Sequence, residues 1–484
     1  MPDPFSFFVF PRENPPRRPV EERIRDWHEV EQMLPSGRLE HQALRCMDCG
    51  VPFCEMYGCP LRNRIPDWIN MVCGNNWRMA LELLHSTNNF PEITGRVCPA
   101  PCEPACTLSI NGSPVTIRHI ELQIAERGWR EGWIEPLPAL NKTGKKIAII
   151  GSGPAGLTAA QQLARYGHSV TVFDRDSRIG GILRYGIPEF MLEKWVLDRR
   201  IDQMIREGVI FETGVDVGVD LSIGYLKRTF DSVVIITGSR IPCDLQVPGR
   251  RLDGIYFAYD FLACQNRRLA GDTIPPEKNI TAEGRKVVII GGGDTGAYCI
   301  GVSRRQGALG ITQAEIMPAP ENGAIGGNAG VQHAEPLQKS WPFYSGIPET
   351  TGSHDEGCNR LRGVKVKKFL GKKGRVNSVV LTRVGVQHAE PLPLPLRGND
   401  ETVYELPADM VILAMGFAHT EQGPLIQNLS LVTDEKMNLK INDNYMTSAE
   451  GIFAAGDCVL GGSSVVQAMH QGREVAEAVN GYLR

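Results

Sequence analysis

The stretch Lys146-Ile-Ala-Ile-Ile-Gly-Ser-Gly-Pro-Ala-Gly156 joins a short apolar run to a glycine-rich turn, and a helical pattern follows. Such a run is typical of a parallel strand that is buried on both faces. In this setting Gly151 permits a tight turn, Gly153 lets the backbone approach a pyrophosphate, and Gly156 lets the helix pack on the strand. The phosphates would lie at the N-terminus of that helix. The stretch therefore predicts a dinucleotide-binding α/β domain.

The same design occurs a second time in the chain. The apolar run Lys286-Val-Val-Ile-Ile290 leads into Gly291-Gly-Gly293-Asp294-Thr-Gly296, which again opens a helical pattern. A single Gly-x-Gly-x-x-Gly is a weak signal, because such turns also end ordinary strands. Two copies, each set between a strand and a helix, predict two doubly wound parallel-sheet lobes. Each lobe would bind its nucleotide at the carboxyl ends of the strands.

Two further apolar runs end in an aspartate. Ser169-Val-Thr-Val-Phe173 is followed by Asp174, whose carboxylate can hold ribose hydroxyls. Near the C-terminus, Gly451-Ile-Phe-Ala-Ala-Gly-Asp457 has the pattern of a buried strand that delivers a carboxylate beside a glycine. Taken alone, the second stretch is explained by a strand that ends in a polar turn. Together with the first glycine turn, it favours an FAD domain built from two separate segments.

Length and composition are compatible with a protein of several domains. A chain of 484 residues corresponds to about three domains of ordinary size. Its apolar content of 42% and charged content of 22% are those of a soluble globular protein. A net charge of -3 gives no reason to expect nucleic acid as a partner. Because no apolar run is long enough for a membrane span or a signal peptide, a cytoplasmic location is expected.

Cysteine is concentrated in the N-terminal quarter. Of 13 cysteines, eight lie between Cys46 and Cys106 at spacings short enough to converge on metal. In a cytosolic chain this clustering indicates metal or redox chemistry rather than a disulfide scaffold. Both structural zinc and iron–sulfur clusters use such thiolate sets. The flavin domain favours clusters, because a flavin accepts two electrons as hydride and clusters pass them on singly.

A flavin domain can instead exchange electrons with a disulfide. Enzymes of that kind carry a Cys-x-x-Cys in the nicotinamide domain, or a cysteine pair soon after the first ribose-binding acid. Residues 175–188 contain no cysteine. Cys299 and Cys358 are the cysteines between the second glycine turn and Met415, and they are far apart in the sequence. The electrons must therefore leave the flavin by another route.

Five motifs are highly specific when they are taken together. They are Cys46-Met-Asp-Cys-Gly-Val-Pro-Phe-Cys54, Gly58-Cys-Pro-Leu-Arg-Asn-Arg-Ile-Pro66, Thr87-Asn-Asn-Phe-Pro91, Cys98-Pro-Ala-Pro-Cys-Glu103 and Gly180-Gly-Ile-Leu-Arg-Tyr-Gly-Ile-Pro188. With them the chain resembles the small (beta) subunit of bacterial glutamate synthase almost from end to end. The resemblance is weakest over residues 318–359.

The resemblance implies two lobes like those of pyridine-nucleotide-disulfide oxidoreductases, preceded by a mainly helical iron–sulfur domain. It implies a flavoprotein that binds FAD, oxidises NADPH and passes electrons through two 4Fe-4S clusters to a large FMN-containing subunit, which makes L-glutamate from L-glutamine and 2-oxoglutarate. Gly181 then becomes a candidate FAD contact. Hydride passes between bound cofactors, so no catalytic side chain is required. Two alternatives stay open: a similar subunit that serves a ferredoxin or pyrimidine reductase, and a scaffold protein with structural zinc.

Related electron-input modules, such as that of dihydropyrimidine dehydrogenase, imply how the metal ligands divide. The first set is Cys46, Cys49, Cys54 and Cys106. The second set is Cys59, Cys98, Cys102 and Glu121. Glu121 stands where relatives use an oxygen-bearing side chain, and a solvated helix carboxylate is the alternative for it. Cys73 falls outside both spacing groups and is interpreted as a buried thiol.

The chain divides into four segments. Residues 1–140 form the helical iron–sulfur domain, in which a helix is expected over residues 20–33. Residues 141–285 form the first part of the FAD-binding domain, 286–415 the NAD(P)H-binding domain, and 416–484 the second part of the FAD-binding domain. Thr237-Gly238 and Met415-Gly416 follow apolar runs and are the expected crossings between the lobes.

The choice between NADPH and NADH depends on side chains near the second glycine turn. A 2′-phosphate favours arginine, and a free ribose hydroxyl favours a carboxylate. Arg304 and Arg305 end the helix after the turn, and Glu315 belongs to the following strand. The resemblance favours NADPH, with NADH possible, although Tyr298 departs from the family's usual polar pattern.

Two features of the second lobe are not accounted for by nucleotide binding. Residues 363–384 read as a hairpin that turns at Gly371 to Gly374. The octamer Gly-Val-Gln-His-Ala-Glu-Pro-Leu occurs from Gly330 and again from Gly385, and two short copies do not make a solenoid. The Gly- and Pro-rich stretch over residues 319–358 is expected to be a loop.

Overall fold

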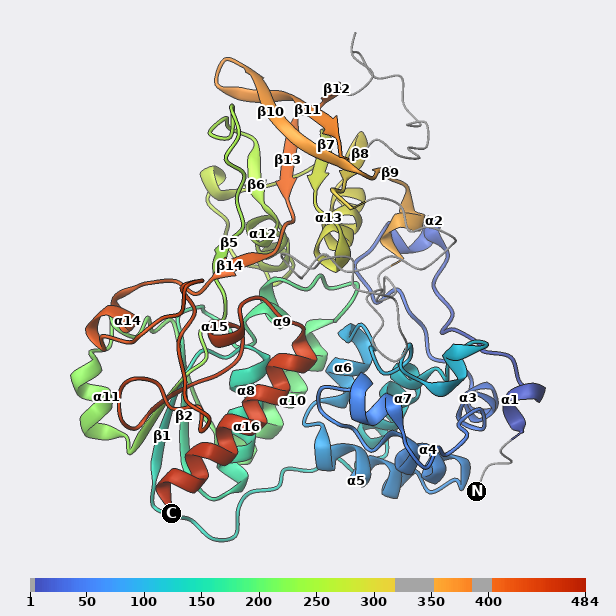
Figure 1. The fold of residues 1–484 in the computed structure, drawn as a ribbon, viewed down its shortest axis with the longest axis vertical. Helices are drawn as coiled ribbons and strands as arrows, with labels where there is room; N and C mark the ends of the chain where they lie inside the picture. The colour runs from blue at the N-terminus through green and yellow to red at the C-terminus, as the bar shows by residue number, and fades with distance from the viewer. Residues whose placement is uncertain (1–4, 318–351, 385–402) are drawn as a thin grey trace.

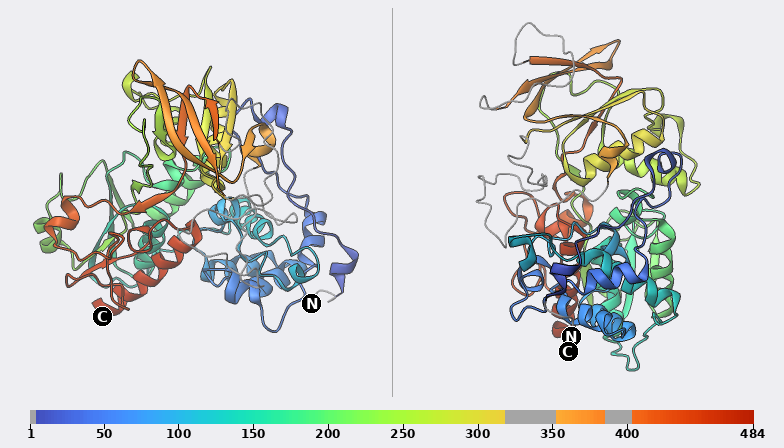
Figure 2. Two further views of the ribbon diagram at one scale, coloured as in Figure 1. Left: turned by 45° about the horizontal axis from the view of Figure 1, so that its top comes forward. Right: turned by 90° about the vertical axis from the view of Figure 1, so that its right-hand side faces the viewer.

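Three parts of the chain lie side by side in the computed structural model, which describes residues 5–317, 352–384 and 403–484 (Figure 1). The N-terminal part is helical, and the two glycine turns lie in two separate α/β lobes. The second lobe lies across the top of the other two parts (Figure 2). The predicted fold class is confirmed, because each lobe has its own parallel sheet. Within the described ranges, no helix combines the length and apolar character that a bilayer crossing needs.

The N-terminal part packs short helices around the cysteine loops. Its elements are α1 (Ser6–Val9), α2 (Val20–Arg23), α3 (Ser36–Ala43), the π-helical η1 (Cys54–Gly58), α4 (Ile65–Cys73), α5 (Trp77–Thr87), α6 (Pro91–Val97), the 3-10 helix η2 (Thr107–Ile110) and α7 (Ile117–Arg130). Helix α4 has Pro66 in its first turn, where a missing N–H costs little, and it buries Trp68 and Ile69. The Asn76 side chain caps α5 by accepting the N–H of Met79.

The predicted helix over residues 20–33 is wrong beyond its first turn. Helix α2 ends at Arg23, and no further helix begins before α3. We call residues 11–35 the N-terminal arm. Asp26 interrupts the helical pattern, because its carboxylate accepts the His28 N–H at 3.0 Å and pairs with Arg18 at 2.5 Å. Local bonds from a side chain to the backbone of this kind compete with helix formation.

The first lobe is a five-stranded parallel sheet with helices packed on it. The strand order is β15-β4-β1-β2-β3, and the strands are β1 (Lys146–Ile150), β2 (Ser169–Asp174), β3 (Ile210–Thr213), β4 (Ser232–Ile235) and β15 (Ile452–Ala454). Its helices are α8 (Pro154–Arg165), α9 (Ile182–Tyr185), α10 (Lys194–Arg206), α11 (Ile223–Thr229), α14 (Pro424–Asn428), α15 (Asp457–Leu460) and α16 (Val465–Leu483). Strand β4 is buried along its whole length, as expected for a strand covered on both faces.

The second lobe repeats this plan and adds an antiparallel layer. Its parallel sheet has the order β6-β13-β7-β8-β9, with β6 (Ile255–Phe257), β7 (Lys286–Ile290), β8 (Gly310–Ala314), β9 (Asn359–Leu361) and β13 (Met410–Leu413). Its helices are α12 (Ala258–Leu269), the 3-10 helix η3 (Pro276–Lys278), α13 (Gly293–Arg305) and the 3-10 helix η5 (Ser353–Glu356). The antiparallel layer is β10 (Val364–Lys372), β11 (Arg375–Arg383) and β12 (Val403–Pro407).

The chain passes between the lobes through a short antiparallel ribbon. Strand β5 (Ile241–Pro242) pairs with β14 (Phe417–His419), and both follow the predicted crossings. The predicted start of the second lobe at residue 286 lies too late, because β6 and α12 already belong to the second lobe. Strand β6 has only three residues, all half-buried, and runs directly into α12, so the sequence does not separate it from the helix.

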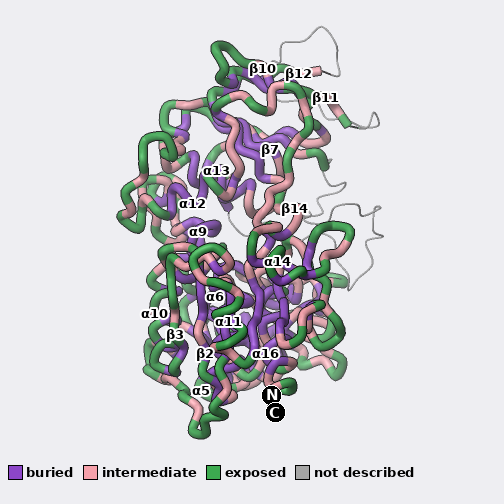
Figure 3. Tube along the Cα trace, turned by 90° about the vertical axis from the view of Figure 1, so that its left-hand side faces the viewer, coloured by how far each residue is buried: buried purple, intermediate pink, exposed green. Residues whose placement is uncertain are grey.

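Burial differs between the inner strands of the sheets and the outer hairpin (Figure 3). The central strands of both sheets are buried, and the hairpin β10–β11 is largely exposed on one face. The predicted hairpin is confirmed, and its turn places Lys373 at φ +53° and Gly374 at φ +80°. Both copies of the repeated octamer lie outside the described residues. Of the expected loop over residues 319–358, the structure describes residues 352–358, and these contain the 3-10 helix η5.

Candidate functional site

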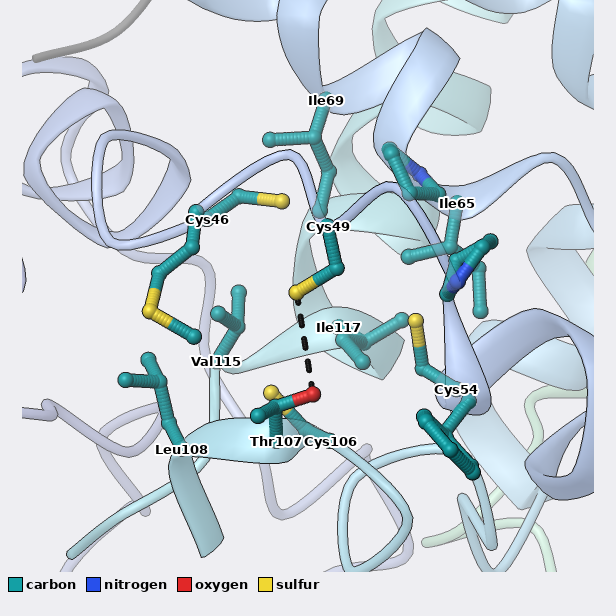
Figure 4. Close-up of a pocket in the computed structure, with 14 residues that line it drawn as sticks. Cys46, Cys49, Cys54, Ile65, Ile69, Cys106, Thr107, Leu108, Val115 and Ile117 are labelled. Atoms are coloured by element: carbon teal, nitrogen blue, oxygen red, sulfur yellow. Dashed lines mark hydrogen bonds between the residues drawn. The ribbon is translucent and has the colours of Figure 1, made fainter. Parts of the chain in front are cut away.

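Four cysteines of the N-terminal part face one pocket (Figure 4). Cys46 and Cys49 lie on the loop after α3, Cys54 begins η1, and Cys106 immediately precedes η2. Between the first two, Asp48 has a φ of +49°. That conformation is rare for a residue other than glycine and recurs at functional sites. All four cysteines line this pocket, so the structure brings the first predicted ligand set together.

The wall around these four sulfurs is mostly apolar. It includes Ile65, Ile69, Leu108, Val115 and Ile117, and the Thr107 hydroxyl lies 3.6 Å from the Cys49 sulfur. Burial raises the pKa of Cys46 to about 12 and also raises the pKa of Cys54. Both thiols are therefore protonated at neutral pH in the metal-free protein. Iron ions would supply the positive charge that favours thiolates.

A second pocket of about 340 Å³ is lined by the second predicted ligand set, Cys59, Cys98, Cys102 and Glu121. Cys59 follows η1, Cys98 follows α6, and Glu121 lies on α7. Burial raises the pKa of Cys59 to about 12 and raises the pKa of Cys98. Ile65 contributes to the walls of both pockets, so the two sites are neighbours.

Glu121 is buried rather than solvated, so the alternative of a solvated helix carboxylate is wrong. One of its carboxylate oxygens accepts from the Asn88 amide at 3.3 Å and from the Thr94 hydroxyl at 2.5 Å, and the other accepts from the Asn63 amide at 3.2 Å. Burial raises the pKa of Glu121 to about 7. Cys73, by contrast, is half-buried on α4 and lines neither pocket.

The two donor sets suit polynuclear clusters better than single ions. All 13 cysteines lie in described residues, and none of them forms a disulfide. Within those residues, no three His, Cys, Asp or Glu side chains are arranged to hold one metal ion. A tetrahedral zinc would need its thiolates about 2.3 Å from one point. The eight donors instead form two sets of four around two neighbouring pockets, and four protein ligands is the number that a 4Fe-4S cluster takes.

Replacement of Glu121 by glutamine is expected to disrupt the second cluster and leave the first intact. The neutral amide keeps the size of the side chain and is a poorer ligand for iron, so roughly half of the bound iron should be lost. Electron paramagnetic resonance of the reduced protein, with iron and sulfide analysis, measures this. Glu126→Gln is the control, since Glu126 lies on the same helix and binds Arg96 at 2.6 Å. An unchanged second-cluster spectrum would exclude Glu121 as a ligand.

The first glycine turn leaves room for a phosphate. Gly151 has a φ of +109°, and a Cβ there would lie 2.2 Å from the carbonyl oxygen of Ile236. A Cβ on Gly156 would lie 2.0 Å from the carbonyl oxygen of Gly151, and a Cβ on Gly181 would lie 2.9 Å from Gly153. A Cβ on Gly153 would meet no atom within 4 Å. The open space at Gly153 therefore lies at the N-terminus of α8, where the helix dipole favours an anion.

Asp174 supports this turn from the end of β2. One carboxylate oxygen accepts the Ser152 N–H at 2.8 Å and the Ser152 hydroxyl at 2.5 Å, and the other accepts the Asp176 N–H at 2.9 Å. The Ser152 hydroxyl accepts the Gly180 N–H at 2.9 Å, which ties the Gly180-Gly181 segment to the turn. Asp174 thus lies at the edge of the sheet where the sequence predicts ribose contacts, and these contacts stay a prediction.

Asp457 lies at the same edge of the first sheet. It begins α15 after β15, and the Ser463 hydroxyl donates to its carboxylate at 2.5 Å. Burial raises the pKa of Asp457. A Cβ on the preceding Gly456 would lie 3.1 Å from the Cβ of Ala155 on α8. The two distant segments predicted to form one FAD domain therefore meet beside the first glycine turn.

The second glycine turn has the same construction. Gly291 has a φ of +115°, and a Cβ there would lie 2.2 Å from the carbonyl oxygen of Ala414. A Cβ on Gly296 would lie 2.9 Å from the carbonyl oxygen of Gly291. Gly293 opens α13 with a φ of +68°, and Asp294 lies in the first turn of that helix. The turn thus presents a helix N-terminus at the carboxyl edge of the second sheet.

Charged side chains lie beside this second turn. Glu315 directly follows β8, and a Cβ on Gly292 would lie 3.0 Å from its Oε2 atom. Arg360 of β9 donates to the other oxygen of Glu315 at 2.7 Å. Arg304 is exposed at the end of α13, whereas the Arg305 side chain is 1% exposed and pairs with another carboxylate. The structure therefore does not bring Arg305 to the carboxyl edge of the second sheet, where the dinucleotide is expected.

Comparisons with known proteins agree with this arrangement. Residues 23–133 match the family described as dihydropyrimidine dehydrogenase domain II, 4Fe-4S cluster. Residues 145–321 and 355–472 match the family described as pyridine nucleotide-disulphide oxidoreductase. The glutamate synthase (NADPH) small chain of Mycobacterium tuberculosis is 47% identical over 100% of this chain and 96% of that protein. This chain belongs to the glutamate synthase small-chain family.

Other relatives are similar over nearly the whole of this chain. The NADPH-type small chain of Bacillus subtilis is 37% identical over 100% of this chain and 99% of that protein. The glutamate synthase (NADH) of Schizosaccharomyces pombe is 39% identical over 98% of this chain and 22% of that protein. Among solved structures, FprA of Mycobacterium tuberculosis in complex with NADPH has a TM-score of 0.51 at 16% identity, over 69% of this chain and 84% of that chain. This last likeness concerns the fold.

Several side chains that shape these sites were missed at the sequence level. Asn63 and Asn88 bind Glu121, and both lie in motifs that carried the family resemblance without an assigned role. Arg360 lies in a three-residue strand with no motif around it. Its role beside Glu315 depends on the pairing of β8 with β9, which the sequence alone does not give.

Proposed function

We propose that this chain is the electron-input subunit of a glutamate synthase. It would hold FAD in the first lobe, NADPH in the second and a 4Fe-4S cluster in each cysteine pocket. Its partner would be a large FMN-containing subunit that makes L-glutamate from L-glutamine and 2-oxoglutarate. The observation that carries the proposal is the union of two glycine-turn lobes with two four-donor pockets in one chain. Membership of the small-chain family supports it.

The protein's own part in hydride transfer is position and exclusion of water. FAD and NADPH supply the redox chemistry when they are bound. The N-termini of α8 and α13 would each bind a pyrophosphate, at Gly153 and Gly293. The two lobes then orient the rings by their relative placement, and no side chain acts as an acid or base.

The order of the sites in space supports transfer from the first lobe to the N-terminal part. Val466 of α16, a helix of the first lobe, lines the second pocket. Ile65 separates the second pocket from the first. All four ligands of the second pocket are buried, whereas Cys49 and Cys54 of the first are partly exposed. We therefore place the contact with the large subunit near the first pocket.

Co-purification with a large subunit tests the partner. The tagged chain, purified with its clusters from cells that also express the FMN-containing subunit, should recover a complex that oxidises NADPH only with L-glutamine and 2-oxoglutarate present. The chain alone should reduce dyes and form no glutamate. Recovery of a ferredoxin or pyrimidine reductase, with no glutamine-dependent activity, would replace this function with the alternative partner.

Metal analysis separates this function from the scaffold alternative. Purified under nitrogen, the protein should contain iron and acid-labile sulfide. Zinc without sulfide would overturn the redox function. We also propose a cytoplasmic location, which is supported by the lack of a disulfide among the 13 cysteines of the described residues, since reduced thiols are typical of that compartment.

Arg360→Leu is expected to lower kcat/KM for NADPH by roughly tenfold, or about 1.4 kcal/mol, and to change that for NADH much less. The substitution leaves the Glu315 carboxylate without its 2.7 Å partner, and that charge then repels a 2′-phosphate but still accepts from ribose hydroxyls. Steady-state dye reduction with each dinucleotide measures the ratio. Arg362→Leu, two residues along the same segment, is the control. An equal loss with both dinucleotides would contradict a role in selecting the phosphate.

A further inference from the structure

A buried group of three charges joins the N-terminal arm to the second lobe. Arg23 of α2 donates from Nε to the Glu356 Oε1 atom at 2.8 Å. Arg305, the last residue of α13, donates to the two oxygens of the same carboxylate at 2.6 and 3.1 Å. The exposed fractions of these side chains are 3% for Arg23, 1% for Arg305 and 0% for Glu356. We call these three residues the ion triad.

The first lobe contacts the ion triad through Phe190. The Arg305 guanidinium lies 4.0 Å from the centre of the Phe190 ring, and the Phe190 carbonyl oxygen accepts the N–H of Val30 in the arm. A Cβ on Gly301 of α13 would lie 2.5 Å from Phe190 and 2.8 Å from Ser353. Helix α13 therefore packs directly against the first lobe and against η5.

Backbone groups complete the binding of both arginines. Arg23 donates from Nη2 to the carbonyl oxygen of Gly352 at 2.8 Å, and Arg305 donates from Nε to that of Asp26 at 3.0 Å. Each arginine thus reaches across the junction, one from the arm to the second lobe and the other from the second lobe to the arm. The ion triad therefore joins the arm and the second lobe by several buried hydrogen bonds rather than by one surface ion pair.

Stability alone is a weak reason for a buried ion group. Apolar side chains of similar volume often stabilise a protein equally well, because charges lose hydration on burial. Charged groups with several fixed donors do impose one geometry, and the Glu356 carboxylate accepts in a defined pattern from two guanidinium groups. The arrangement therefore favours a role in orientation.

The position of α13 connects this orientation to the reaction. The N-terminus of α13 is the second glycine turn, where the dinucleotide pyrophosphate is expected, and its C-terminus is Arg305. The expected contacts to the dinucleotide pyrophosphate lie within the second lobe, and those to the FAD pyrophosphate lie within the first. The distance between the two rings depends instead on how the lobes are held together.

We propose that Glu356 is a positioning residue that fixes the second lobe, through Arg305 and Arg23, in the orientation that hydride transfer requires. This inference rests on the proposed function for its kinetic consequence. Loss of the ion triad should slow flavin reduction and leave dinucleotide affinity nearly unchanged. A misplacement of about 1 Å between reacting groups can slow a reaction by on the order of 100-fold.

The test uses the full-length protein with its FAD and clusters in place. Glu356→Gln keeps the size of the side chain and removes its charge. Stopped-flow reduction of the flavin by NADPH should slow at least about tenfold, while the Kd taken from the concentration dependence changes less than about threefold. Hydrogen exchange without nucleotide should rise both over residues 17–30 and at the C-terminal end of α13.

Two further variants make the result specific. Asp355→Asn is the matched control, because Asp355 neighbours Glu356 but is 65% exposed, and its 3.5 Å pair with Arg17 of the arm is a surface pair, which contributes little. It should behave as wild type. Arg23→Gln removes the contact on the arm side and leaves Arg305 and Glu356 as a neutral pair within the second lobe. It should reproduce the slower reduction, and it tests the proposal if Glu356→Gln does not fold.

The outcomes separate the inference from the proposed function. Wild-type rates and exchange in folded Glu356→Gln and Arg23→Gln proteins would overturn the positioning role. So would a loss of dinucleotide affinity in proportion to the rate, since that indicates a damaged nucleotide site. A wild-type protein that NADPH and NADH fail to reduce would instead refute the proposed function, and hydrogen exchange would still report on the ion triad.

Discussion

Cys46→Ser protein is expected to lose the first cluster and electron delivery to the partner, while NADPH still reduces its flavin. Cys46 is one of four donors around the first pocket, and that pocket lies in a different part of the chain from the FAD lobe. Replacement of even the outer partners of metal ligands typically costs about 10- to 100-fold, so glutamate formation should fall by at least on the order of 100-fold. NADPH-driven dye reduction at the flavin should remain measurable.

Electron paramagnetic resonance and assays with and without the large subunit distinguish these effects. Cys73→Ser is the control, because Cys73 lies on α4 in the same part of the chain and lines neither pocket. It should keep both cluster signals. If Cys46→Ser protein retains its helical circular dichroism and yet loses flavin reduction, the separation between the hydride site and the cluster site is wrong.

Gly153→Val protein is expected to fold and to bind no FAD. Gly153 is the N-cap of α8, has extended backbone angles of φ -64° and ψ -178°, and would place a Cβ in open space. A branched side chain therefore fits the backbone and fills the space that the pyrophosphate needs. FAD binding should weaken by at least about 100-fold, or roughly 2.7 kcal/mol, as measured by flavin absorbance after purification and by titration of the apoprotein.

The chain offers a closely matched control for this substitution. Gly423 is the N-cap of α14, is also followed by a proline, has φ -84° and ψ -175°, and would also place a Cβ in open space. Gly423→Val protein should keep its flavin. Gly151→Val should fail differently, by loss of folded protein, because its side chain would collide with the Ile236 carbonyl oxygen. Full flavin content in Gly153→Val would place the pyrophosphate elsewhere.

The parts of the fold that were predictable are those with a local physical signature. Runs such as residues 146–150 and 286–290 are strongly apolar because the parallel strands are covered on both faces, and each glycine turn follows its strand directly. The cysteine sets were predictable as two groups because family resemblance supplied the division that spacing alone left open. The pockets then brought each group together as expected.

The parts that were not predictable depend on distant partners. Glu121 resembles a solvated helix residue until Asn63 and Thr94 are seen to enclose it. Arg305 resembles a phosphate ligand, but its charge is used by Glu356, which lies 51 residues away in the sequence. The crossing at Thr237-Gly238 was predicted, but the lobe boundary was placed too late at residue 286, because β6 becomes a strand by pairing with β13, which lies much later in the chain.

The pairing of β15 with β4 has a consequence for biosynthesis. Strand β15 comes from residues 452–454, so an edge of the first sheet and Asp457 are absent until the ribosome has translated past residue 457. The inserted second lobe is synthesised before that sheet is complete. FAD binding is therefore expected late in translation. A nascent chain that is stalled before residue 450 should contain the cysteine-rich region but bind no FAD, and so should lack the yellow colour of a flavin.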